Sequence, residues 1–98
     1  MKVGKVIGNI WATRKDERLK GFKMLLIQPI NILDGSLDEV PVVAADTIGA
    51  GVGETVIYVG GSSARSAAGD MQTPVDATVV GIVDDFEFDQ SVIGGGTP

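Results

Sequence analysis

Three stretches of the chain carry residue types that often do chemistry, and the first is the glycine-rich run of residues 49–54. Loops of this composition bind phosphate groups through their backbone N–H groups. A dinucleotide-binding fingerprint would need a glycine at the position of Glu54 and a helix after it, whereas the next residues alternate as a β-strand does. The chain also lacks the Gly-Lys-Ser/Thr sequence of a nucleotide phosphate loop. We therefore expect Gly49, Gly51 and Gly53 to let the backbone turn or approach a neighbouring chain closely, and not to bind a ligand.

The second stretch offers Ser62 and Ser63 as nucleophiles, with Arg65 shortly after them. A serine needs a neighbouring base to attack a substrate, and the chain contains no histidine and no nearby lysine. A short helix over residues 62–68 is the simpler interpretation, with one of the serines as its N-cap and Gly69 closing its C-terminal end. Arg65 would then be placed to hydrogen-bond a neighbouring chain.

The third stretch, residues 84–89, is densely acidic. In a strand, alternate carboxylates of this run would share one face, and their oxygens suit calcium or magnesium. The run lacks the glycine and the ligand spacing of a calcium-binding loop, so we expect a solvated edge with Phe86 and Phe88 packed inward. Zinc is excluded more firmly, because the chain has neither cysteine nor histidine. The sequence thus predicts no catalytic residue, no cofactor and no metal site.

Much of the chain that contains these stretches shows side-chain alternation with a period of two residues, which is typical of β-strands. Alternation, together with glycine and proline breaks, predicts five strands at residues 2–13, 22–28, 40–47, 54–59 and 77–83, and one short helix at residues 62–68. The second strand is apolar at successive positions, which is typical of a strand buried on both faces, either in a barrel or at an interface. We expect an all-β fold, a small closed antiparallel barrel, because closure removes the sheet edges that so short a chain would leave exposed. The barrel would occupy residues 1–84, followed by an acidic and then glycine-rich arm at residues 85–98.

Size and composition narrow the class of function. The 98 residues make one small domain, 44% hydrophobic and 21% charged, which association with other chains would help to stabilise. A net charge of −5 disfavours binding to nucleic acid. No stretch has the length and apolarity of a membrane span or of a signal peptide, so a cytosolic protein is the simplest interpretation.

Several blocks of sequence, in order and with natural spacing over residues 1–84, resemble the bacterial-microcompartment vertex proteins of the EutN/CcmL type. The blocks are Lys5-Val6-Ile7-Gly8, Trp11-Ala12-Thr13-Arg14-Lys15, residues 21–29, Ala45-Asp46, residues 49–54, Gly60, Ser62-Ser63-Ala64-Arg65, Pro74-Val75-Asp76-Ala77 and Val80-Gly81-Ile82-Val83-Asp84. Residues 85–98 lie outside the resemblance.

The resemblance implies a β-barrel of the oligonucleotide/oligosaccharide-binding (OB) type that assembles as a homopentamer. Such pentamers cap the fivefold vertices of polyhedral shells in the bacterial cytoplasm, next to hexameric or trimeric shell proteins, and catalyse nothing. It also implies that two segments lie at or near the subunit contacts and the fivefold axis. These segments comprise Gly49, Ala50, Gly51, Gly53, Glu54, Ser62, Ser63, Ala64 and Arg65.

Two other classes of function stay open from the residues themselves. An OB-type module that binds oligonucleotides or oligosaccharides would need a basic or aromatic face, and the chain has five aromatic residues in all. A small enzyme subunit would need a polar constellation in a cleft, and the motifs above do not supply one.

Overall fold

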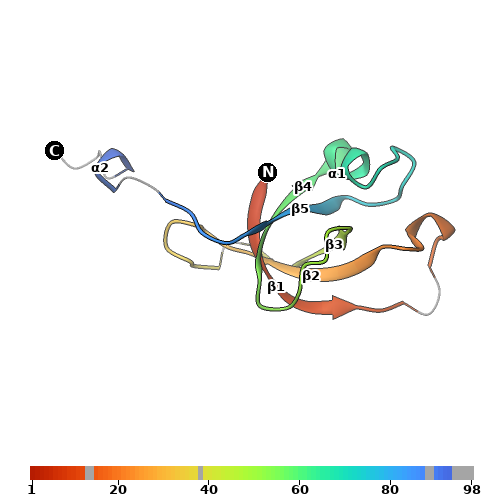
Figure 1. The fold of residues 1–98 in the computed structure, drawn as a ribbon, viewed down its shortest axis with the longest axis horizontal. Helices are drawn as coiled ribbons and strands as arrows, with labels where there is room; N and C mark the ends of the chain where they lie inside the picture. Colours follow the sequence, from red (N-terminus) through yellow and green to blue (C-terminus); the bar gives the residue numbers. More distant parts are fainter. Residues whose placement is uncertain (13–14, 38, 88–89, 94–98) are drawn as a thin grey trace.

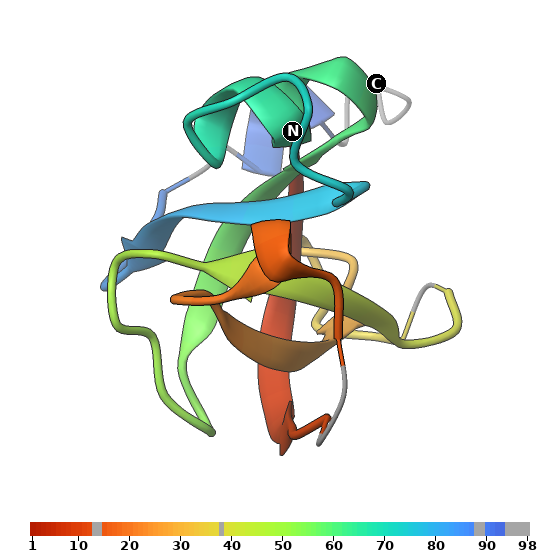
Figure 2. The same cartoon turned by 90° about the vertical axis from the view of Figure 1, so that its right-hand side faces the viewer.

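The fold was analysed in a computed structural model that describes residues 1–12, 15–37, 39–87 and 90–93. Five strands form a closed barrel in the order β1-β2-β3-β5-β4, with a short helix against its side and a thin arm at one end (Figures 1 and 2). The elements are β1 (Lys2–Ile10), the 3-10 helix η1 (Glu17–Leu19), β2 (Lys23–Pro29), β3 (Val42–Asp46), β4 (Thr55–Gly60), α1 (Gly61–Ala67), β5 (Ala77–Val83) and α2 (Gln90–Ile93).

The barrel is mixed, so the expectation of an antiparallel barrel was wrong. Strands β3 and β5 run parallel, with Ala45 opposite Thr78, whereas the other four pairings are antiparallel. Direction cannot alternate all the way around a ring with an odd number of strands, so one neighbouring pair must be parallel. The short β3–β5 pairing closes the barrel at that point.

Side-chain alternation along each strand places the core inside the barrel. Its largest fully buried members include Leu25, Ile27, Val6, Val56 and Val79. Within the subunit, only one face of β2 is fully buried, because alternate residues are fully buried and those between them are only half-buried. The expectation that β2 is buried on both faces is therefore not met in a single chain.

The helix covers a second, smaller core outside the barrel. Ala45, Ala64 and Val75 are buried there, and Phe22 and Met24 pack against them. The predicted serine cap was wrong, because α1 begins after Gly60 and no side chain caps its first turn. The predicted closure by Gly69 is confirmed by a φ of 105° and by its N–H, which donates to the Ser66 carbonyl at 3.0 Å.

One close backbone approach depends on a glycine inside the barrel. Gly4 of β1 lies so near β2 that an added Cβ would clash with the Ile27 side chain and would come within 2.9 Å of the Gln28 carbonyl oxygen. Since the latter atom belongs to the backbone, it has little freedom to move away. Gly4 therefore lets β1 lie closely against β2 as the barrel closes.

Candidate functional site

The structure places the two predicted assembly segments at opposite ends of β4. The glycine loop, residues 47–54, leads into β4, and α1 follows directly from its other end. Figures 1 and 2 both show α1 at the top of the molecule, and Figure 2 shows the glycine loop running down one side of the barrel to its lower half. The six residues of β4 span roughly 20 Å at the usual rise per residue. The nine predicted residues are therefore two separate groups.

The buried carboxylate of Asp46 fixes the first turn of the glycine loop. Its Oδ1 accepts hydrogen bonds from the N–H groups of Ile48 at 3.0 Å and Gly49 at 3.2 Å, and its Oδ2 accepts one from Ala50 at 2.7 Å. Asp46 is only 3% exposed, so these backbone donors satisfy a charge that water hardly reaches. Ala50 is fully buried beneath the loop.

The second half of the glycine loop is held by further contacts within the chain. Glu54 Oε1 accepts from the Gly51 N–H at 2.6 Å, and Lys23 Nζ donates to the Ala50 carbonyl at 2.8 Å. The Gly53 N–H donates to the Val6 carbonyl at 2.8 Å, which ties the loop to β1. Most backbone N–H groups of the loop are thus already paired, and the loop does not present the row of free donors that a phosphate cradle needs.

Two of the loop glycines have backbone angles that favour glycine. Gly49 and Gly53 have φ values of 89° and 95°, in the region that other residues rarely adopt. Gly51 differs, because it has no positive φ and an added Cβ would make only an ordinary contact at 3.5 Å with Glu54 Oε1. Nothing within the subunit requires glycine at position 51.

Helix α1 is anchored by its buried face and leaves its polar side chains outside. Thr78 Oγ1 donates to the carbonyl of the fully buried Ala64 at 2.7 Å. Ser62 and Ser63 are exposed, Arg65 is half-buried, and none of the three side chains bonds to another described residue. No described side chain bonds to either serine, so no base activates them among the residues that the structure describes.

The acidic segment differs from its prediction. Phe86 is 46% exposed, so it does not pack inward as expected, whereas Phe88 lies outside the described residues. The Phe86 N–H donates to Asp85 Oδ1 at 2.8 Å. Among the described residues, no three acidic side chains gather in a geometry that could hold a metal ion.

The connection between β1 and β2 carries an exposed ion pair. Both carboxylate oxygens of Asp16 bond Arg18, with Nη2 to Oδ2 at 2.8 Å and Nε to Oδ1 at 2.9 Å. The side-chain hydrogen bonds from Arg18 hold the pKa of Asp16 well below its usual range, and the same bonds raise the pKa of Arg18. In the loop after β2, the pKa of Asp34 is also lowered, by hydrogen bonds from Ser36.

Sequence reasoning missed the residues that shape both segments, namely Asp46, Lys23 and Thr78. Only Asp46 had a local signal, because an aspartate followed after a few residues by glycine is typical of a side chain that hydrogen-bonds nearby backbone N–H groups. Lys23 and Thr78 act on residues 27 and 14 positions away in the chain, and no local pattern predicts such contacts.

A comparison with known families identifies this barrel. The family described as "Ethanolamine utilisation protein EutN/carboxysome" matches residues 1–84, which contain all five strands and α1. The chain belongs to the EutN/CcmL family. The sequence resemblance is thereby confirmed.

Individual relatives cover nearly the whole chain. The microcompartment shell vertex protein GrpN of Rhodospirillum rubrum is 47% identical over 90 residues, which are 89% of this chain and 97% of GrpN. The carboxysome shell vertex protein CcmL of a Nostoc species is 39% identical over 93 residues, 95% of this chain and 92% of that protein. A solved structure of an ethanolamine utilization protein, EutN, superposes with a TM-score of 0.86 at 42% identity and covers 90% of this chain and 91% of its own.

Membership of the EutN/CcmL family establishes the class of function of this chain. It is a structural shell vertex protein of bacterial microcompartments, and the family is not catalytic. No helix among the described residues is long and apolar enough to cross a membrane. The glycine loop and α1 are therefore interpreted below as assembly surfaces.

Proposed function

We propose that five copies of this chain form a closed ring that caps a vertex of a polyhedral shell, where it adjoins hexameric or trimeric shell proteins. The observation that carries the proposal is the match to the GrpN pentameric microcompartment shell protein of Rhodospirillum rubrum. That structure superposes with a TM-score of 0.80 at 43% identity, and the alignment covers 91% of this chain and all of GrpN. A shared fold over the whole of a pentameric chain supports the same assembly here.

The separation of the two segments supports a head-to-tail ring. A ring of identical subunits needs two different, complementary faces on each subunit. We place the glycine loop nearest the fivefold axis, where five copies crowd together and the absence of a Cβ at Gly51 permits close approach. Arg65, at the far end of β4, would contact a neighbouring subunit away from the axis with its guanidinium, which has no partner among the described residues. Ala50 and Ala64 are buried within the subunit, so they would hold these segments in place.

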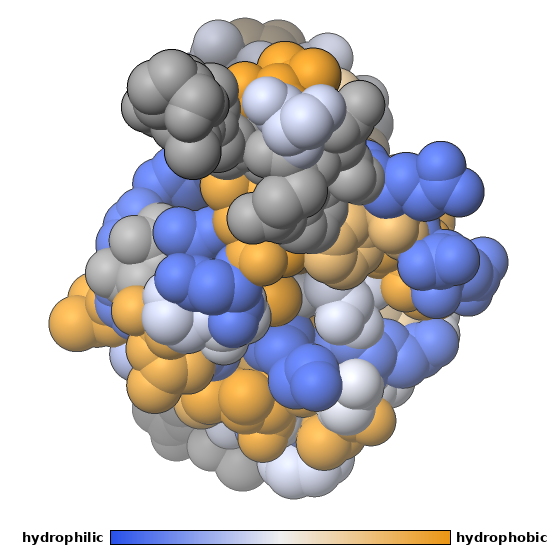
Figure 3. Space-filling view, turned by 90° about the vertical axis from the view of Figure 1, so that its left-hand side faces the viewer, coloured by the Kyte–Doolittle hydropathy of each residue, from blue (hydrophilic) through white to orange (hydrophobic). Residues whose placement is uncertain are grey.

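The surface of a single subunit also favours association. Ile7 is 46% exposed on β1, and Val80 is 39% exposed on β5, although outward positions on a barrel in water are usually polar. Figure 3 shows hydrophobic surface between hydrophilic patches on the end that carries the arm. Apolar surface of this kind is typical of protein–protein contacts.

Native mass spectrometry tests the proposal directly. We expect a single assembly of five times the chain mass of 10.1 kDa at micromolar concentration. A stable monomer, dimer or hexamer would contradict it. Co-expression with a hexameric shell protein should then yield closed polyhedral particles by electron microscopy, and open sheets or tubes should form when this chain is omitted. Closed particles in both cases would contradict the role at the vertex.

A further inference from the structure

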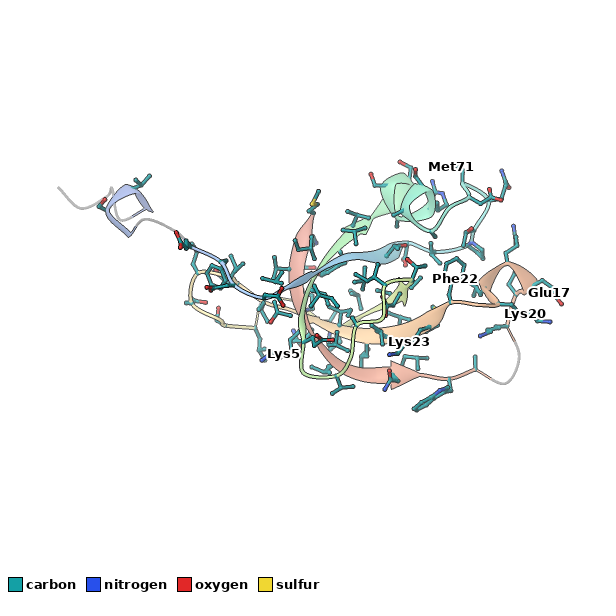
Figure 4. All side chains as sticks on the ribbon, viewed as in Figure 1. Lys5, Glu17, Lys20, Phe22, Lys23 and Met71 are labelled. Carbon is teal, nitrogen blue, oxygen red and sulfur yellow. The ribbon has the colours of Figure 1, made fainter. Side chains whose placement is uncertain are left out.

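A cleft of about 340 Å³ lies where β1 ends and β2 begins. Trp11 and Phe22 contribute aromatic surface to it, and Lys15 and Lys23 contribute two ammonium groups. Figure 4 shows Phe22 and Lys23 at the end of the molecule that also carries Glu17 and Lys20, opposite the arm. The cleft therefore lies on the part of the barrel away from the arm.

Three groups of this cleft lack a partner among the described residues. The side-chain oxygen of Asn9 is buried and accepts no hydrogen bond there. Trp11 is 86% exposed, although it is the sole tryptophan of the chain and a large apolar side chain. Lys15 forms no ion pair with any described carboxylate. An exposed tryptophan is a frequent anchor of protein contacts, and an ammonium group without a carboxylate partner can attract an acidic segment.

The distribution of charge indicates what the cleft attracts. Residues 14–23 contain five of the eight cationic residues and two of the thirteen acidic ones, a net charge of +3, so the rest of the chain carries −8. The cleft lies in this basic region and none of its lining residues is acidic. An acidic segment with an aromatic side chain would complement it.

The arm of this chain has that chemistry. Asp84, Asp85, Phe86 and Glu87 are all exposed, and Val92 of α2 is 74% exposed. The arm extends away from the barrel (Figure 1), so that the radius of gyration is 15.2 Å, whereas a compact chain of this length has about 13 Å. A projecting segment with exposed apolar side chains favours a contact with another molecule.

We propose that the acidic arm of one copy docks in the basic cleft of a second copy. Carboxylates of the arm pair with Lys15, and Phe86 packs against Trp11. The arm and the cleft lie at opposite ends of the subunit, so the contact is head-to-tail and can close around a ring. This inference rests on the proposed pentamer and adds a contact to it.

A second hollow on the barrel fits the arm less well. It has a volume of about 450 Å³, and Met1, Val42 and Tyr58 give it an apolar lining. Its lysine, Lys2, already pairs with Glu39 at 3.1 Å, and Asp76 adds a negative charge to the lining. The lysine of this hollow is thus already engaged and a carboxylate lies beside it, whereas Lys15 in the first cleft pairs with no described carboxylate.

The sole tryptophan makes the contact measurable in the full chain. We expect Trp11 emission at short wavelength and weak quenching by acrylamide, since the docked arm would cover the indole. A chain that ends at Val83 should show red-shifted emission and strong quenching. Adding a synthetic peptide with the sequence of residues 84–93 should restore the short-wavelength emission saturably, and the effect should weaken as salt is added. A peptide with every acidic residue changed to its amide should not restore it.

Matched lysine variants of the chain that ends at Val83 locate the contact. Lys15→Ala should weaken binding of the peptide about fivefold, the effect of losing roughly 1 kcal/mol from one charge pair. Lys20→Ala should leave the affinity unchanged, because Lys20 lies outside the cleft and pairs with Glu17 at 2.8 Å. Equal effects of the two changes, or no response to the peptide, would overturn the proposal.

The outcomes separate this inference from the pentamer itself. If the full chain is a pentamer by native mass and its Trp11 remains exposed, the arm does not dock and the proposed function stands. If Trp11 is covered equally with and without the arm, another surface of a second copy fills the cleft and the inference is overturned. If the full chain is a monomer, the proposed function fails, and peptide binding still decides whether the cleft recognises the arm.

Discussion

The glycine loop at one end of β4 and helix α1 at the other differ in where their polar groups find partners. In the loop, Asp46, Lys23 and Glu54 pair with the backbone, so its conformation is fixed within one chain. In α1, Thr78 donates a buried hydrogen bond to the helix, whereas the guanidinium of Arg65 has no described partner. The loop is complete in the subunit, and the helix surface is completed by a neighbour if the ring forms as proposed.

If the ring forms as proposed, this difference teaches that its two assembly segments require different kinds of residue. A loop near a symmetry axis must keep one shape in all five copies, which buried charge-assisted hydrogen bonds provide. A lateral contact must offer groups that another chain can bind, which exposed serines and an arginine provide. Changes in the loop should therefore act on the fold of the subunit, and changes on α1 should act on assembly.

The largest effect is expected from Asp46→Ala. The change leaves three backbone N–H groups of the loop without their acceptor, one of them on the buried Ala50, and should lower the free energy of unfolding by about 3 kcal/mol. Urea denaturation at fixed protein concentration measures the change. Asp34→Ala is the matched control, because Asp34 makes a similar bond to the Ser36 N–H in an exposed loop, and its effect should be much smaller. Similar losses from both would show that the glycine loop is not held by its buried carboxylate.

On α1, Arg65→Ala should destabilise the pentamer and leave the fold of the subunit unchanged. Loss of charged hydrogen bonds to a neighbour should cost about 2 kcal/mol per subunit contact. Sedimentation over a range of concentrations measures dissociation, and circular dichroism checks the fold. Lys20→Ala, on the exposed connection between β1 and β2, is the control. If both variants dissociate at the same concentration, Arg65 is not a contact residue.

Two glycines of the loop allow an effect on the fold of the subunit to be separated from an effect on assembly of the pentamer. Gly53→Ala should destabilise the subunit by about 1–2 kcal/mol, because its φ of 95° strains any residue with a Cβ. Gly51→Ala meets no such strain and should leave the subunit fold intact, so a weaker pentamer would report crowding at the axis. Thermal unfolding and native mass spectrometry distinguish the two variants. A fully stable pentamer of Gly51→Ala would place the loop away from the axis.

The smallest effect is expected at the anchor of α1. Thr78→Val keeps the side-chain shape but removes the 2.7 Å hydrogen bond to the buried Ala64 carbonyl, which should cost about 1 kcal/mol. Hydrogen exchange should show faster opening of α1, with little change in β1 and β2. Ser62→Ala, whose hydroxyl bonds no described residue, should leave exchange unchanged. Uniformly faster exchange across the barrel would show that the helix is part of the barrel's cooperative unit.

Local patterns in the sequence predicted the elements well. The fifth strand and the closure of the helix at Gly69 are as expected, and the helix and three of the other strands are displaced by only one or two residues. The first strand ends at Ile10, whereas the prediction extended it to Thr13, which lies outside the described residues. Alternation, turn glycines and family blocks are properties of neighbouring residues, and they survive folding because they act over a few positions.

The tertiary structure alone decided how these elements meet. The parallel β3–β5 pair and the bond from Lys23 to the Ala50 carbonyl both join residues distant in the chain. So does the cleft beside Trp11, whose lining comes from the end of β1 and the start of β2. Contacts of this kind depend on how the whole barrel closes and on which groups are buried when it does, and neither is written in a local pattern.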